Sequence, residues 1–216
     1  MDRFTTAKFE LLSYAARKNS AELSDGSKAI KSYIKKLSDK KDPEELRGIE
    51  GISSRRYFSC FPHLINQEIW HWQGRNRRPP KDGVNSLLSF GYTFLEKEIR
   101  IAIAGAGMDA SIGFFHVNNN RKDSLVYDLM ELFRANVIDK FVISQLNHGC
   151  FLPTDFIQHA TRGCTLEDTA RLRWLLKLEE LMETEKSCFG HKCCREYIRK
   201  QVADFAYRLW DYAETV

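Results

Sequence analysis

The sequence lacks several features that would assign a protein to a class at once. Its 216 residues contain no apolar run of about 18 residues, the length that a membrane-spanning helix needs. The first residues, MDRFTTAKFELL, lack the long apolar core of a secretory signal peptide. We therefore expect a cytoplasmic protein whose six cysteines are reduced thiols.

Familiar nucleophile and phosphate motifs are also missing. The sequence holds no Gly-x-Ser-x-Gly, no P-loop and no Gly-x-Gly-x-x-Gly. It shows no internal repeat and almost no alternating strand pattern. What remains is helical periodicity over most of the length, so the predicted fold class is mostly α.

Basic residues are clustered although the formal net charge is only +4. The segment WHWQGRNRRPPKDG is a predicted loop, because its two prolines and its glycines interrupt regular structure. It carries Arg75, Arg77, Arg78 and Lys81. A further row, Lys28, Lys31, Lys35 and Lys36, lies opposite the apolar face of an expected helix. That row is read either as a solvated face, which we favour, or as a phosphate-facing surface.

Five further helices are predicted. One begins at residue 43 and contains Gly48 and Gly51, which suggest close approach by another backbone or a ligand. A central apolar helix capped by Asp82 spans residues 83–107, and another follows residue 124. Two more occupy residues 166–185, capped by Thr165, and 195–212.

One histidine and three acids form a candidate metal set: Glu50, His116, Asp128 and Glu131. One imidazole with carboxylates suits Mg²⁺ or Mn²⁺ better than structural zinc. On these residues alone the ordinary interpretation is favoured, in which the acids are solvated and the histidine is a core residue. The cysteine-rich segment CFGHKCC does not have standard zinc-finger spacing, so its thiols are read as free or buried, with structural zinc as the alternative.

Four long sequence blocks that occur in one order favour the metal-site interpretation instead: LRGIEGISSRRYF, GRNRRPPKDGVNSLLSFGYTFL, GMDASIGFFH and SLVYDLMELFR. Together they closely resemble the helical catalytic domain of the CRISPR-associated integrase family, often called Cas-one. The resemblance covers residues 30–147 well and the C-terminal helices loosely. It implies a DNA-capture enzyme of CRISPR adaptation.

The resemblance also implies roles for single residues. Glu50, His116 and Glu131 match the family's metal ligands, Asp128 matches an assisting acid, and Tyr92 matches a tyrosine close to the reacting DNA end. The implied cofactor is Mg²⁺ or Mn²⁺. The expected DNA-binding residues are the basic ones near these motifs: Arg55, Arg56, Arg75, Arg77, Arg78, Lys81, Arg121 and Lys122.

Family members usually begin with a β-rich domain that forms the dimer, and no such pattern precedes the helices here. We expect N-terminal helices over residues 1–42 and one helical catalytic domain over residues 43–216. The chain is then either a compact member or a fragment. A compact member is expected to act as a homodimer or a higher even-numbered assembly, with or without the family's small ferredoxin-like partner protein.

Three functions remain open at this level. The first is an integrase, in which the 3′-OH of a short DNA attacks a phosphodiester at a CRISPR repeat, with disintegration as the reverse reaction. The second is a nuclease of branched DNA that does not integrate. The third is a helical DNA-binding scaffold without catalytic activity.

Overall fold

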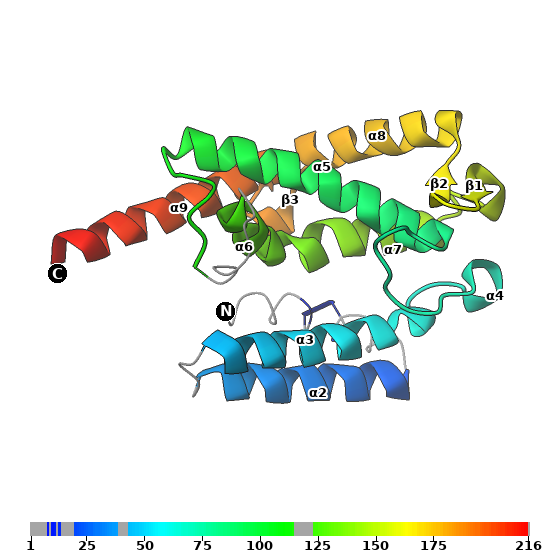
Figure 1. The fold of residues 1–216 in the computed structure, drawn as a ribbon, viewed down its shortest axis with the longest axis horizontal. Helices are drawn as coiled ribbons and strands as arrows, with labels where there is room; N and C mark the ends of the chain where they lie inside the picture. The colour runs from blue at the N-terminus through cyan, green and yellow to red at the C-terminus, as the bar shows by residue number, and fades with distance from the viewer. Residues whose placement is uncertain are drawn as a thin grey trace. The chain divides into compact units, whose positions relative to one another are not determined.

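The computed structural model describes residues 8, 10, 11, 13, 20–38, 43–114 and 123–215. Most of these residues are helical, which confirms the predicted mostly-α fold (Figure 1). They form two compact units, each assembled from two stretches of the chain. Unit 1 contains Met1–Ser89 and Ala135–Ala170, and unit 2 contains Phe90–Arg134 and Arg171–Val216. The domain boundary expected at residue 42 stays a prediction.

Unit 1 is built from helices and one small strand pair. Its elements are α2 (Ala21–Ser38), α3 (Pro43–Ser59), η1 (Phe61–His63), α4 (Gln67–Trp70), the start of α5 (Gly83–Gly105), most of the π-helix η2 (Arg134–Asp139), α7 (Lys140–Asn147), η3 (Pro153–Asp155), β1 (Phe156–His159) and β2 (Gly163–Leu166).

Two helices and an aromatic cluster form the core of unit 1. Helix α2 packs along α3 (Figure 1), and Ile30 and Tyr57 are fully buried. The ring of Phe61 stacks on Trp72 with centroids 5.0 Å apart. The hydroxyl of Tyr57 donates a hydrogen bond to Asp139, at 3.0 Å. This bond ties α3 to the π-helical turn, so the helix that bears Glu50 is fixed at its far end.

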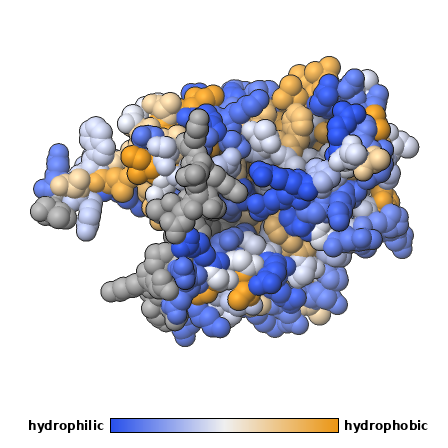
Figure 2. Space-filling model, in the orientation of Figure 1, coloured by the Kyte–Doolittle hydropathy of each residue, from blue (hydrophilic) through white to orange (hydrophobic). Residues whose placement is uncertain are grey.

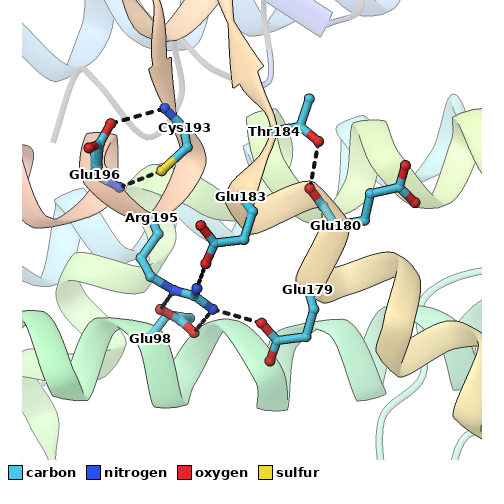
Figure 3. Close-up of polar contacts among 8 residues, drawn as sticks. All are labelled: Glu98, Glu179, Glu180, Glu183, Thr184, Cys193, Arg195 and Glu196. Carbon is cyan, nitrogen blue, oxygen red and sulfur yellow. Dashed lines mark hydrogen bonds and ion pairs between the residues drawn. The ribbon is translucent and has the colours of Figure 1, made fainter.

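Unit 2 holds the rest of α5 and the C-terminal elements. These are α6 (Ser124–Phe133), most of α8 (Asp168–Glu183), β3 (Glu185–Lys186), η4 (Ser187–Phe189), β4 (Lys192–Cys193) and α9 (Cys194–Thr215). Figure 3 shows Arg195 at the start of α9 among three glutamates. Its guanidinium donates two hydrogen bonds to Glu98 of α5, both 2.9 Å, one to Glu179 of α8, at 2.8 Å, and another to Glu183. One side chain therefore joins three helices.

The central helix and its N-terminal cap were predicted correctly. Helix α5 begins at Gly83, where the Asp82 carboxylate accepts a hydrogen bond from the backbone N–H of Asn85, at 2.8 Å. Leu87, Leu95 and Ile99 are fully buried along its length. As predicted, the segment from 71 to 82 forms no helix or strand.

Two local expectations were wrong, and a third is tested only in part. The strand pairs β1–β2 and β3–β4 are antiparallel and had no alternating pattern to reveal them. Thr165 lies in β2, where it pairs with Ile157, and α8 begins only at Asp168. At Gly48 and Gly51, apart from the helix's own backbone, no atom of the described residues lies within 4 Å of where a Cβ would be, so close approach by another described backbone is not found and approach by a ligand stays a prediction.

The last turns of α9 expose large aromatic side chains. Tyr207, Trp210 and Tyr212 are each about two thirds exposed or more, at 73%, 68% and 71%. Figure 2 shows apolar surface on this end of the helix. The homodimer or higher even-numbered assembly expected from the sequence stays a prediction. Among the described residues, no helix is long and apolar enough to cross a bilayer.

Candidate metal centre and nucleic-acid interface

Glu50 lies in the middle of α3 and is held from one side. Its Oε1 accepts a hydrogen bond from the hydroxyl of Ser54, at 2.6 Å, one helical turn further on. The ammonium of Lys8 lies 3.5 Å from the same oxygen and donates to Ser54 Oγ at 2.6 Å. The Glu50 side chain remains 28% exposed. It is therefore oriented by protein contacts while part of it stays accessible.

Glu131 lies on α6 and is held by a different cation. The guanidinium of Arg134, three residues later, forms an ion pair with its carboxylate. The same guanidinium lies over the ring of Tyr92, 5.0 Å from the centroid. Tyr92 is buried, and Glu131 and Arg134 are each 14% exposed. Tyr92, Arg134 and Glu131 therefore form one connected row inside unit 2.

Asp128 is buried rather than lying on an open helix surface as the sequence suggested. It is 1% exposed, and its Oδ2 accepts a hydrogen bond from the backbone N–H of Phe114, at 2.7 Å. A Cβ at Gly113 would lie 2.8 Å from that oxygen, so only glycine fits there without a shift. Asp128 thus fixes the backbone two residues before His116.

His116 itself lies outside the described residues, as do Arg121 and Lys122. Glu50 belongs to unit 1, and Asp128 and Glu131 belong to unit 2. Within the described ranges, no three His, Cys, Asp or Glu side chains are grouped as a metal site. The meeting of Glu50, His116 and Glu131 around an ion therefore stays a prediction.

A basic hollow of about 590 Å³ lies in unit 1 beside the helix that bears Glu50. Arg55 and Arg77, both exposed, are among its lining residues, and Phe58 and Trp72 add aromatic surface. Ser54 also lines the hollow, and it is the residue that donates to Glu50. A basic surface and a candidate metal ligand are thus adjacent in one unit.

Arg75 lines the same hollow but is engaged inside the protein. Its guanidinium donates to the side chains of Asn85, at 2.7 Å, and Ser89, at 3.2 Å, and to the backbone carbonyl of Asn76. These bonds fix the basic loop onto α5. The other predicted DNA contacts differ in exposure: Arg78 and Lys81 are exposed, and Arg56 is half-buried.

Lys81 lines a second hollow of about 610 Å³, together with Trp70, Asp82 and Cys164. Burial raises the pKa of the Cys164 thiol to about 11, and the Asp82 carboxylate adds to this effect. The thiol is therefore a poor nucleophile at neutral pH. In the segment 188–194, Cys193 and Cys194 are buried while His191 is exposed, and the described side chains there do not gather as a zinc site.

Comparison with known sequences decides the family. The sequence model described as "CRISPR associated protein Cas1" matches residues 6–180. The chain belongs to this family. This confirms the resemblance read from the four sequence blocks.

Curated relatives in the Cas1 family include larger proteins. "CRISPR-associated endonuclease Cas1 1" of Chlorobaculum tepidum is 32% identical over 185 residues, which cover 85% of this chain and 54% of that protein. A "CRISPR-associated exonuclease Cas4/endonuclease Cas1 fusion" of Geobacter sulfurreducens is 41% identical over 147 residues, covering 66% of this chain and 26% of that protein. The chain thus spans about half the length of the first relative and a quarter of the second.

Solved structures share the fold over nearly the whole chain. A "Casposase bound to integration product" has a TM-score of 0.77 at 26% identity, and the match covers 96% of this chain and 59% of the casposase chain. A chain of a "Cas6-RT-Cas1--Cas2 complex" has a TM-score of 0.83 at 25% identity and covers 98% of this chain and 23% of its own.

Three residues of the site were missed by sequence reasoning: Lys8, Ser54 and Arg134. The spacing of three residues from Glu131 to Arg134 was a usable signal, because such pairs are neighbours on a helix. Ser54 lies one turn after Glu50 and could have been noted in the same way. Lys8 gave no signal, since it lies 46 positions before Ser54.

Proposed function

We propose that this member of the Cas1 family is a metal-dependent DNA integrase of CRISPR adaptation. In the proposed reaction, the 3′-OH of a short DNA attacks a phosphodiester at the edge of a CRISPR repeat. A new phosphodiester forms, the old phosphorus–oxygen bond breaks, and the displaced DNA strand leaves with a free 3′-OH. The number of phosphodiester bonds is unchanged, so no energy cofactor is needed.

The observation that carries this proposal is the adjacency of the basic hollow and Glu50 through Ser54. Arginines bind the phosphate backbone without regard to sequence. Arg55 and Arg77 would therefore hold a DNA strand beside α3, and the half-buried ring of Phe58 would stack against an unpaired base. The backbone would then pass close to the Glu50 carboxylate.

The donor set fits a hard divalent ion. Glu50 and Glu131 each present an oriented, partly buried carboxylate, and oxygen ligands of this kind suit Mg²⁺ and Mn²⁺. Glu50, His116 and Glu131 would hold the ion, and Asp128 would position the loop that carries His116. A bound divalent ion would polarise the phosphoryl oxygens and lower the pKa of a coordinated hydroxyl.

The Tyr92–Arg134–Glu131 row supports an indirect role for Tyr92 at the reacting DNA end. Arg134 holds Glu131 while its guanidinium is fixed by the tyrosine ring. A planar guanidinium held in this way can also face a phosphate. Tyr92 would then act mainly by positioning Arg134, because its ring is buried.

The test is strand transfer with purified protein, a labelled 3′-OH DNA end and a plasmid that carries a repeat. Wild-type protein should join the label to the plasmid with Mg²⁺ or Mn²⁺ present, and the His116→Ala and Glu50→Ala proteins should not. DNA binding should persist in both variants because phosphate contacts supply most of the affinity. Joining at the wild-type rate by the His116→Ala protein would contradict the proposal.

The same assay separates the other two functions. A nuclease of branched DNA would cut the plasmid without joining the label, and a scaffold would bind DNA and do neither. The integrase is favoured because one structural neighbour is a casposase bound to its integration product. Two copies acting together are expected, since one set of ligands serves one DNA end, and exposed aromatic residues on α9 offer a contact surface.

A further inference from the structure

Lys8 is a buried lysine that reaches the helix carrying Glu50. It is 5% exposed, and its ammonium donates to Ser54 Oγ at 2.6 Å and lies 3.5 Å from Glu50 Oε1. Lysine is almost never fully buried unless it is paired. No role follows for Lys8 from the metal set or from the expected DNA contacts. Its buried position beside a candidate metal ligand therefore needs an explanation.

The chemistry of the three groups fixes the direction of both hydrogen bonds. An ammonium group has donors only, so Ser54 Oγ accepts from Lys8. The serine hydroxyl has a single proton, and its oxygen lies 2.6 Å from Glu50 Oε1. Two oxygens at that distance need a hydrogen between them. Ser54 therefore donates its proton to Glu50.

Without Lys8, Ser54 would have a competing arrangement. A serine inside a helix can donate to the backbone carbonyl four residues earlier, which for Ser54 is the carbonyl of Glu50. The Lys8 contact holds Ser54 Oγ toward the Glu50 side chain instead. Both contacts use Oε1, and within the described residues Oε2 has no hydrogen-bond partner. The carboxylate is thus held by one oxygen and offers the other.

We propose that Lys8 and Ser54 are positioning residues that orient Glu50 so that its Oε2 faces a metal ion or substrate. The inference rests on the proposed function, because it takes Glu50 to be a metal ligand. Partners of this kind behind a ligand typically change metal affinity by about 10- to 100-fold. Lys8 acts through Ser54, so the two substitutions should not have independent effects.

The experiment measures Mn²⁺ binding to the full chain by isothermal titration calorimetry, with no DNA present. Ser54→Ala should bind Mn²⁺ about tenfold more weakly than wild type, and Ser54→Thr should restore binding because it keeps the hydroxyl. Lys8→Met should lose affinity to a similar extent. The double variant should resemble either single variant rather than show the product of the two losses.

Matched controls lie on α2. Ser32→Ala removes a helical hydroxyl that donates to the Ala29 carbonyl, at 2.7 Å. Lys28→Met removes one positive charge that is paired with Asp25, at 3.5 Å. Both controls should bind Mn²⁺ with wild-type affinity. Thermal unfolding of every variant shows whether it is folded, and if Lys8→Met does not fold, the Ser54→Ala and Ser54→Thr pair carries the test.

Three outcomes would overturn the inference. Wild-type affinity in Ser54→Ala would show that the hydroxyl does not orient Glu50. Tighter Mn²⁺ binding in Lys8→Met would show that Lys8 is only a competing cation. Multiplying losses in the double variant would show that Lys8 acts independently of Ser54. The Glu50→Gln variant distinguishes failure of this inference from failure of the proposed function. If it binds Mn²⁺ with wild-type affinity, Glu50 is not a metal ligand, and the proposed ligand set is wrong as well as the positioning role.

Discussion

Glu50 in unit 1 and Glu131 in unit 2 are chemically alike but are held in different ways. Glu131 is paired with a cation on its own helix, and that cation is stacked on a buried aromatic ring. Glu50 is held through a hydroxyl by a lysine from a distant part of the chain. The Glu50 side chain is also twice as exposed, at 28% against 14%. One carboxylate is thus fixed by local spacing and the other by tertiary packing.

The difference has a functional consequence. A guanidinium stacked on a ring is planar and pre-organised, so Glu131 is held rigidly. A lysine acting through a serine is a longer connection, so Glu50 can adjust more easily. If the two carboxylates bind one ion as proposed, we expect Glu131 to be the more rigid ligand and Glu50 the one that adjusts.

The largest expected effect is the loss of strand transfer when either carboxylate is replaced. It tests whether the two carboxylates are equivalent in the reaction. Glu50→Gln and Glu131→Gln should each lower strand transfer below detection, since each removes a charge that the proposed ion needs. Folding should be retained, which circular dichroism can check. A variant at one position that still joins DNA at the wild-type rate would break the equivalence and remove that residue from the ligand set.

A smaller effect concerns stability. Arg134→Met should lower the free energy of unfolding by about 2–4 kcal/mol, because it leaves a largely buried carboxylate unpaired and removes a cation–π contact. Lys8→Met should cost less, about 1–2 kcal/mol, since Glu50 is more exposed. Urea unfolding measures both. A larger loss of unfolding free energy in Lys8→Met than in Arg134→Met would show that Glu50 is held more strongly than Glu131.

Two of the three arginines of the hollow differ in the same way, since Arg75 is engaged internally and Arg77 is exposed. Arg75→Ala should lower the free energy of unfolding by about 1–3 kcal/mol, because the hydrogen bonds from Arg75 to Asn85, Ser89 and the Asn76 carbonyl are lost. Arg77→Ala should leave stability unchanged and lower the log–log salt slope of duplex DNA binding by about 0.9. An unchanged slope for Arg77→Ala would place its contacts inside the protein.

The smallest effect is a titration confined to unit 1. Burial raises the pKa of the Cys164 thiol from 9.0 to about 11. The protonated thiol is favoured in the folded state, so its contribution to stability is complete below pH 9 and is lost as the pH rises through 11. Urea unfolding should show this decline in wild type and a shallower one in Cys164→Ala. Identical profiles would contradict the buried position of the thiol.

Much of the fold could be read from the sequence because helices are local. Apolar periodicity gave α5 and its buried face, and Asp82 was recognised as its cap. The short strands could not be read, since β1 pairs with β2 over only four positions and has no alternating burial. Asp128 was misplaced because a buried carboxylate that serves a backbone N–H resembles a surface acid in sequence.

The sequence by itself determined the family, the helical class and the residue types available for the site. Those properties depend on the order of motifs and on local spacing. Only the tertiary structure showed that Lys8 reaches Ser54 and Glu50, that Arg75 is tied to α5, and that Asp128 holds the backbone before His116. Contacts between residues far apart in the chain depend on packing, and no local pattern encodes them.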